Sequence, residues 1–144
     1  MDLRLRSATL ADMDFARELT RVNMRRYYTE YERVWQGQLF DAEWVFRNSS
    51  VIVKADKQIG YFSVSPETGY LYLRDVQLCE PYRGEGVGAW VMDQIAMIAR
   101  EQGFRNIRLK VFKSNPATQL YQRQGYAVIR EDDELFWMEC ILKD

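Results

Sequence analysis

The sequence predicts an α/β fold in which helices cover both faces of a mixed sheet. Three observations carry this prediction. The chain has 144 residues, which fits a single domain spanning 1–144. Its hydrophobic patterns follow the order strand, two helices, three strands, helix, strand, helix, two strands. The strand–helix–strand segment from Tyr70 to Val111 is by default a right-handed parallel crossover.

The N-terminal part predicts one strand and two helices. Leucine and arginine alternate over residues 3–6, as in a short half-buried strand. Thr9 then serves as a helix N-cap, with Asp12 as the acidic residue of the first turn. A second helical pattern runs from Glu30 to Phe46, and Gly37 marks a break in it.

The middle of the chain predicts three strands joined by tight turns. The strands cover residues 51–53, 59–65 and 70–78, and the turns cover 56–58 and 66–69. In the third strand the apolar pattern changes phase towards its end. A bulge explains such a change, and so does a strand that is buried on both faces.

The C-terminal part predicts two helices and three strands. A helix from Gly86 to Gln102 stops at Gly103, and Asn115 caps a shorter helix that begins with a proline and ends at Gly125. The strands cover residues 107–111, 126–130 and 135–142, and an acidic turn at 131–134 joins the last two.

The composition excludes several classes of function. Twenty basic residues against 21 acidic ones give a net charge of −1, so the global balance predicts no nucleic-acid partner, although it leaves a local basic patch open. The chain has no histidine, and Cys79 and Cys140 lie far apart, so we expect no metal site. No apolar run is long enough to span a membrane. We therefore expect a reduced, cytoplasmic protein without a membrane partner.

A glycine-rich loop leads from the third predicted strand into the helix that follows it. Gly84, Gly86 and Gly88 stand where the helix begins. A helix start offers unpaired N–H groups and partial positive charge, and glycines let an anion approach the backbone. The spacing is neither that of a phosphate loop nor that of a dinucleotide loop. The alternative is a tight turn that needs glycine only for its dihedral angles.

Two motifs, taken together, resemble those of the GNAT acetyltransferases. Arg83-x-x-Gly86-x-Gly88 is similar to the family signature Gln/Arg-x-x-Gly-x-Gly/Ala. The run Asn115-Pro116-Ala117-Thr118-Gln119-Leu120-Tyr121-Gln122-Arg123-Gln124-Gly125-Tyr126 resembles a second element of that family. The two occur in the family's order and spacing, and the order of strands and helices matches over essentially the whole chain. The resemblance implies a centrally splayed sheet of about seven strands flanked by about four helices.

The resemblance also implies acetyl-CoA as co-substrate and assigns residues to it. The backbone of the glycine loop would cradle the pyrophosphate, the end of the preceding strand would pair with the pantetheine arm, and Asn115 would contact the cofactor or only cap its helix. The residues are Val76, Gln77, Leu78, Arg83, Gly84, Glu85, Gly86, Val87, Gly88, Ala89 and Asn115. Glu85 departs from the family, in which many members carry Lys, Arg or Gln at this position.

Acyl transfer to an amine requires a neutral amine, an oxyanion stabiliser and a proton for the leaving thiolate. Tyr121 matches the family tyrosine that donates this proton; its alternative role is to pack on its helix face. The amide of Leu78 would polarise the thioester carbonyl. Asp75 is the candidate general base, and its alternative is a structural ion pair with Arg74 or Arg108.

The acceptor site is expected in the helical N-terminal region, as the resemblance implies. Aromatic residues there could hold a cationic amine: Tyr27, Tyr28, Tyr31 and Trp35. The alternative is that these residues only pack in the core or lie at its solvated edge. The leading interpretation is a small-molecule amine acetyltransferase, and the alternatives are a protein or peptide N-acetyltransferase and a non-catalytic CoA-binding module. A homodimer is compatible with Phe136–Met138 extending a sheet edge.

Overall fold

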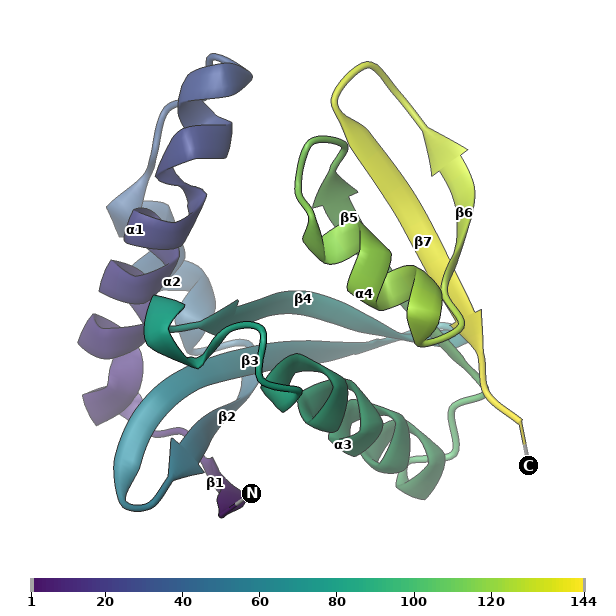
Figure 1. Cartoon of the computed structure of the whole chain (residues 1–144), viewed down its shortest axis with the longest axis horizontal. Helices are drawn as coiled ribbons and strands as arrows, with labels where there is room; N and C mark the ends of the chain where they lie inside the picture. Colours follow the sequence, from purple (N-terminus) through teal and green to yellow (C-terminus); the bar gives the residue numbers. More distant parts are fainter. Residues whose placement is uncertain (1, 144) are drawn as a thin grey trace. The chain divides into compact units, whose positions relative to one another are not determined.

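The computed structural model describes residues 2–143 and confirms the predicted class. Seven strands and four α-helices follow one another in the predicted order (Figure 1). The strands form one mixed sheet in the order β1-β2-β3-β4-β5-β7-β6. They are β1 (Leu3–Ser7), β2 (Asn48–Lys54), β3 (Lys57–Glu67), β4 (Tyr70–Leu78), β5 (Asn106–Phe112), β6 (Ala127–Glu131) and β7 (Leu135–Ile141). The helices are α1 (Met13–Glu30), α2 (Gly37–Trp44), α3 (Val87–Glu101) and α4 (Ala117–Arg123).

The chain divides into two compact units, and β3 and β4 each contribute to both. The first unit comprises the described residues up to Val64 together with Asp75–Tyr82. The second unit comprises Ser65–Arg74 and the described residues from Arg83 onward.

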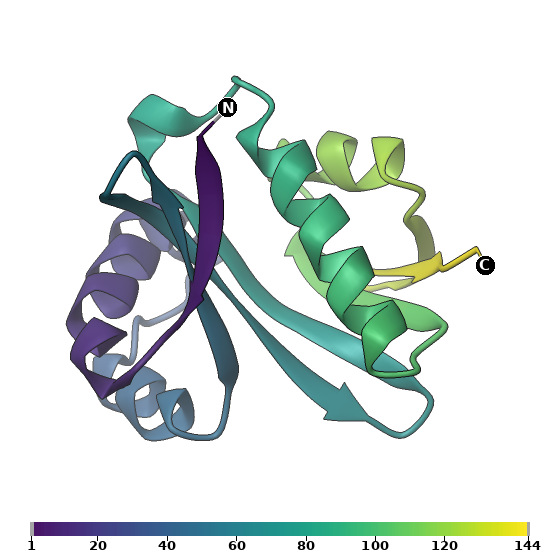
Figure 2. The same ribbon diagram turned by 90° about the horizontal axis from the view of Figure 1, so that it is seen from below.

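In the first unit, α1 and α2 lie on the same side of β1 and β2 (Figure 2). Their buried residues Ala16, Phe40 and Trp44 pack with Tyr61 of β3 into a core cluster. Thr9 caps the short 3₁₀ turn Leu10–Asp12 that leads into α1, as predicted. Asp12 completes a capping box there, since it accepts a hydrogen bond from the Thr9 backbone at 2.8 Å.

The predicted second helix was wrong at its start. The first helix continues to Glu30, the chain then leaves helical geometry, and Glu32 has a φ of 54°. This left-handed conformation ends a helix, because the chain cannot continue in register through it. The predicted break is confirmed close to Gly37, because residues 31–36 are not helical and Gly37 begins α2. A glycine is well tolerated there, because the N–H groups of the first turn have no helical partner in any case.

In the second unit, β4 pairs with β5 in parallel, with Leu71 opposite Ile107. This pairing confirms the predicted parallel crossover. Along α3, Val87, Val91 and Ile95 are fully buried. The predicted edge at Phe136–Met138 was wrong, because β7 lies between β5 and β6 and the outer strand is β6.

The phase change predicted in β4 coincides with three consecutive residues of intermediate burial, Arg74–Val76. Leu71, Leu73 and Gln77 are all buried, and the residues between them are less so. The β2–β3 pairing shifts its register between Ile52 and Val53, and the β6–β7 pairing does so between Val128 and Arg130. A polar side chain therefore occupies a core position at the end of β4, and it needs buried partners.

Candidate functional site

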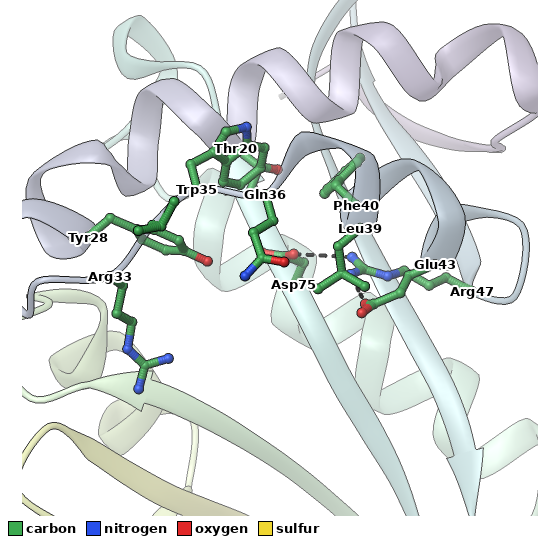
Figure 3. A pocket seen from close by; sticks show the side chains of 11 residues that line it. Thr20, Tyr28, Arg33, Trp35, Gln36, Leu39, Phe40, Glu43, Arg47 and Asp75 are labelled. Atoms are coloured by element: carbon green, nitrogen blue, oxygen red, sulfur yellow. Dashed lines mark hydrogen bonds and ion pairs between the residues drawn. The ribbon is translucent and has the colours of Figure 1, made fainter.

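The first unit contains a cavity of about 540 Å³ between α1, α2 and the end of β4 (Figure 3). Its lining side chains come from three separate stretches of the chain. They are Thr20, Tyr28, Arg33, Val34, Trp35, Gln36, Leu39, Phe40, Glu43, Arg47 and Asp75. Cavities that hold small molecules commonly measure about 300–1,000 Å³, so this one has room for such a ligand.

Aromatic rings form a continuous wall of the cavity. The ring of Trp35 lies 5.9 Å from that of Tyr28 and 5.9 Å from that of Phe40. The series continues into the core through Trp44, which stacks on Phe40 at 5.9 Å and meets Tyr61 edge-on at 5.7 Å. Rings at these separations pack favourably and hold each other in place. The wall is therefore rigid, and it presents aromatic faces to whatever enters.

Arg47 organises the charges of the cavity. Its guanidinium donates to Glu43 at 2.9 Å and to Asp75 at 3.3 Å, and it lies 5.2 Å from the centre of the Phe40 ring. Figure 3 shows both ion pairs as dashed lines. The side chain is only 9% exposed, and its Nε is buried without a hydrogen-bond partner. A buried guanidinium that loses its carboxylate partners strongly destabilises the fold. The three charged side chains therefore depend on one another.

Asp75 lies on the cavity wall and is held from two sides. It accepts a hydrogen bond from Nε2 of Gln77 at 2.7 Å, in addition to the bond from Arg47. Burial raises the pKa of Asp75 above its ordinary value, and the bonds from Gln77 and Arg47 partly offset this rise. The alternative of an ion pair named Arg74 or Arg108 as the partner of Asp75, and the structure provides Arg47 as that partner instead.

A buried hydroxyl pair lies behind Asp75. The Tyr61 hydroxyl lies 2.5 Å from Oγ1 of Thr20, which also lies 2.8 Å from the carbonyl oxygen of Ala16. Burial raises the pKa of Tyr61 well above its ordinary value, and the negative charge of Asp75 raises it further. Tyr61 is therefore a neutral hydroxyl that steadies the carboxylate.

The end of β4 is tied to α1 by one side chain. Nδ2 of Asn23 donates to the Gln77 side chain at 3.1 Å and to the Leu78 carbonyl at 3.0 Å. On the other side, a Cβ at Gly60 would lie 2.3 Å from the Gln77 carbonyl oxygen. The backbone at Val76–Leu78, the stretch expected to meet the cofactor, is thus held by α1 and by a close approach of β3.

The glycine loop lies in the second unit and consists mainly of exposed backbone. Gly84 and Gly86 have φ values of 77° and 83°, which suit glycine. A Cβ at Gly84 would meet nothing within 4 Å. The helix α3 begins at Val87, and no side chain caps its start at Gly86. The N-cap residue itself thus offers no acceptor to the first turn, and an anion could take that place.

The remaining loop residues differ in exposure. Arg83 and Glu85 are exposed, and Ala89 is half-buried. A Cβ at Gly88 would lie 2.9 Å from a methyl group of Leu120, so α3 and α4 approach closely at this point. Since Glu85 is exposed, its negative charge is screened by solvent.

Of the two predicted residues of the second motif, Asn115 lies just before α4 and Tyr121 lies within it. Oδ1 of Asn115 accepts a hydrogen bond from the Ala117 amide at 2.9 Å, which is the predicted capping role. Tyr121 is half-buried, and its ring lies 6.0 Å from that of Tyr126. This placement leaves part of the Tyr121 side chain accessible.

The structure brings some of the predicted acceptor residues together and leaves others apart. Tyr28, Trp35 and Asp75 line the same cavity. Tyr27 and Tyr31 are not among its lining residues; Tyr27 is 6% exposed, and the Arg26 guanidinium lies 5.1 Å from the centre of its ring. These two tyrosines fit the alternative that the sequence left open, the core and its edge.

Sequence reasoning missed Arg47, Asn23 and Gln36. A signal for Arg47 was present, because Glu43 and Arg47 have the i,i+4 spacing of helical ion pairs. Nothing in the sequence connected Asn23 with Gln77, which lies 54 positions further along the chain. Within residues 2–143, no group of three or more Cys, Asp or Glu side chains could hold a metal ion. None of the helices in that range is long and apolar enough to cross a membrane.

Comparisons with known proteins agree with the motifs. The model of the Acetyltransferase (GNAT) family matches residues 16–126. A streptothricin acetyltransferase of Streptomyces lavendulae is 31% identical over 90 residues, which cover 60% of this chain and 48% of that protein. A thialysine N-epsilon-acetyltransferase of Bos taurus is 36% identical over 67 residues, which cover 45% and 39% respectively. The chain thus spans less than half the length of either relative.

Among solved structures, the PaiA N-acetyltransferase of Thermoplasma acidophilum in complex with coenzyme A superimposes with a TM-score of 0.78. The match covers 98% of this chain and 99% of that one, at 16% identity. At this identity the likeness establishes the fold and leaves the activity to be argued from the residues.

Proposed function

The chain belongs to the acetyltransferase (GNAT) family, and we propose that it transfers an acetyl group from acetyl-CoA to a primary amine of a small-molecule acceptor. The observation that carries the choice of acceptor is the cavity of about 540 Å³ in the first unit. A cavity of this size suits a small molecule, whereas a peptide or protein acceptor calls for an open groove. The two curated relatives are named for streptothricin and thialysine, which are compounds rather than proteins.

The residues of the glycine loop fit the pyrophosphate of acetyl-CoA. The loop is open at Gly84, and the start of α3 at Val87 has no capping side chain. Backbone amides at such a start stabilise an anion through hydrogen bonds and through the helix dipole. Acetyl-CoA supplies the activated acetyl group, and the residues of the loop would hold the cofactor in place.

The backbone at the end of β4 would orient the thioester. The Leu78 carbonyl accepts a hydrogen bond from Asn23, and the Cys79 amide donates to the Ile59 carbonyl at 2.8 Å. These bonds fix the strand end from both sides. The Leu78 amide is thereby held in one orientation, as an oxyanion stabiliser must be.

Two side chains would move protons. Asp75 lies on the cavity wall, and its pKa is raised. A general base works best when its pKa lies near the working pH, so this shift favours Asp75 as the group that takes the proton of the amine. Tyr121 would protonate the departing thiolate, since a phenol and a thiol have similar pKa values. The attack is direct, with the neutral amine on the thioester carbon and no acyl group on the enzyme.

The test is the release of CoA thiol from acetyl-CoA across a panel of polyamines, amino acids, aminoglycosides and peptides. We expect acceptor-dependent release with one class of small amine. Release with peptides only would favour the protein acceptor. Tight binding of acetyl-CoA without release on any acceptor would favour the non-catalytic CoA-binding module.

A further inference from the structure

Two side-chain amides connect the end of β4 with the carboxylate of Asp75. Nδ2 of Asn23 donates to the Leu78 carbonyl at 3.0 Å and to Oε1 of Gln77 at 3.1 Å. Nε2 of Gln77 donates in turn to Oδ1 of Asp75 at 2.7 Å. We call Asn23 and Gln77 the amide pair. The four residues belong to the first unit, so these contacts lie within one compact body.

The partners of the amide pair fix the direction in which each amide points. A backbone carbonyl only accepts, so the group of Asn23 that faces Leu78 is its NH₂ group. The same NH₂ group reaches Gln77, which therefore turns its oxygen to Asn23 and its own NH₂ group to Asp75. An ionised carboxylate also only accepts, so both ends of the series require the same orientation. Gln77 thus presents a donor to Asp75.

Packing does not explain the polar residue at position 77. The other buried residues of β4 are Leu71 and Leu73, which fill the core with apolar side chains. Gln77 is 7% exposed, and a buried amide costs free energy unless its groups are hydrogen-bonded. Its oxygen is bonded to α1 and its nitrogen to Asp75. The side chain therefore serves to hold the carboxylate, while its backbone is left for the expected contact with the cofactor.

The donor from Gln77 acts on the orientation and on the charge of Asp75. Gln77 bonds Oδ1 and Arg47 bonds Oδ2, so the carboxylate is held at both oxygens. Burial raises the pKa of Asp75, and the hydrogen bond from Gln77 and the charge of Arg47 oppose this rise. Further ionisable groups around Asp75 come from α1, the segment after it, α2 and β3: Tyr28, Arg33, Glu43 and Tyr61. A change at residue 77 leaves all of these groups in place.

We propose that Gln77 is a positioning residue for acetyl transfer, which holds Asp75 towards the acceptor amine and is itself oriented by Asn23. The inference rests on the proposed function, in which Asp75 takes the proton of the amine and the Leu78 amide polarises the thioester carbonyl. Because Asn23 bonds both Gln77 and Leu78, the amide pair sets the base and the strand end together. Without Gln77 the carboxylate would keep Arg47 and lose its second fixed point.

The first test combines enzyme kinetics with a direct titration of Asp75. Gln77→Met keeps the length of the side chain and removes both amide groups. We expect the rise of kcat/KM with pH to move to higher pH, and kcat at its plateau to fall about ten-fold. The KM for acetyl-CoA should stay nearly unchanged, because Asn23 still holds the Leu78 carbonyl. The acceptor is the same for each variant, so its own ionisation does not contribute to the difference.

The direct titration follows the carbon-13 resonance of the Asp75 carboxyl in the full-length chain without substrates. Asp75→Asn identifies the resonance by its loss. Because kcat/KM reports the ionisation of the free enzyme, the resonance should titrate at higher pH in Gln77→Met, as the kinetic profile does. This readout does not require turnover. A chain that acetylates no acceptor would contradict the proposed function, whereas a titration that Gln77→Met leaves in place would contradict the present inference.

A second variant tests whether Asn23 acts through Gln77. Asn23 is half-buried, and Asn23→Ala should also move the Asp75 titration to higher pH, because the Gln77 amide is no longer held in one orientation. This shift should disappear when residue 77 is already Met, as a double-mutant cycle shows. A shift of the same size in both backgrounds would overturn the inference. So would a titration that Asn23→Ala leaves unmoved.

Ser63→Ala is the matched control for the loss of a buried hydrogen bond. Ser63 is fully buried in the first unit, and its hydroxyl lies 2.7 Å from that of Ser49. The substitution should lower the unfolding midpoint and leave the Asp75 titration and the pH profile unchanged. An equal shift of both in Ser63→Ala would mean that any loss of packing in this unit moves Asp75, and it would overturn the role of Gln77.

Discussion

The cavity of the first unit and the glycine loop of the second are built from different parts of the chain. In the cavity, side chains from distant segments hold one another, with Arg47 bonded to both Glu43 and Asp75. In the loop, the groups proposed to bind are backbone amides, and Gly84 and Gly86 have positive φ angles. A substitution in the cavity should therefore alter stability together with chemistry. A substitution in the glycine loop or at Tyr121 should alter binding or rate and leave stability nearly unchanged.

The largest expected effect is a loss of rate without a loss of stability, for a substitution in the second unit. Tyr121→Phe should lower kcat for acetyl transfer by about 10²- to 10⁴-fold, because the phenol is the proposed proton donor. The unfolding midpoint should barely move, since the ring remains. Tyr126→Phe is the matched control: its ring lies 6.0 Å from that of Tyr121, and it has no assigned role. Equal rates for Tyr121→Phe and the wild type would remove Tyr121 from the mechanism.

The next effect belongs to the cavity. Arg47→Met should lower the free energy of unfolding by about 2–4 kcal/mol, because Asp75 and Glu43 lose their shared partner. Arg47 also lowers the pKa of Asp75, so that pKa should rise further in the variant. Denaturant unfolding measures the loss. The control is Arg21→Met, which breaks an exposed ion pair with Glu18 on α1 and should leave the midpoint unchanged. Equal midpoints for the two variants would contradict the account.

A third prediction tests the backbone at the end of β4. Gly60→Ala would place a Cβ 2.3 Å from the Gln77 carbonyl oxygen, so one strand must move. We expect a loss of about 1–3 kcal/mol in unfolding free energy and a higher KM for acetyl-CoA. Gly37→Ala is the control, because its Cβ would come no closer than 3.4 Å to any side chain. An unchanged KM would show that this strand end does not orient the cofactor.

The smallest expected effect is a difference in pH dependence between two aspartates of the first unit, Asp75 and Asp12. Burial raises the pKa of Asp75 above its ordinary 3.8, so the folded chain keeps a proton that the unfolded chain releases. That contribution to stability is full below pH 3.8 and is lost as the pH rises through the folded pKa. The unfolding free energy of the wild type minus that of Asp75→Asn should therefore fall as the pH rises from about 4, and then level off.

Asp12 provides the opposite case within the same unit. Hydrogen bonds from Arg6 at 2.8 and 2.9 Å lower the pKa of Asp12 to about 2. Its contribution is present above pH 3.8 and is lost as the pH falls towards 2. The unfolding free energy of the wild type minus that of Asp12→Asn should therefore fall as the pH is lowered. Urea unfolding at a series of pH values measures both variants, and slopes of the same sign would contradict the assignment.

The sequence predicted the order of elements, the glycine loop and the α4 motif because those signals are local. The stop at Gly103 and the cap at Thr9 depend on a few neighbouring residues. The start of the second helix was misplaced, because Tyr31–Gln36 carries large residues at helical spacing, and that pattern does not reveal the left-handed conformation of Glu32.

The cavity was only partly predictable. Tyr28 and Trp35 were expected in the acceptor site because aromatic rings can hold a cationic amine. Asp75 was expected as the general base. The contact of Arg47 with Asp75 joins residues 28 positions apart, and it depends on how the segment after α2 is placed against β4. Long-range pairing of this kind follows from tertiary packing, which periodicity does not contain.

The central claim is that the acceptor occupies the cavity of the first unit. Steady-state kinetics of Leu39→Trp tests it most directly, with the acceptor found in the panel. Leu39 lines the cavity and is 49% exposed, so the larger ring can fill space without disturbing the core. Leu10→Trp, at a position that is 67% exposed and outside the cavity, is the control. A raised KM for the acceptor with an unchanged KM for acetyl-CoA is the predicted result. An unchanged acceptor KM would place the acceptor elsewhere and contradict the account.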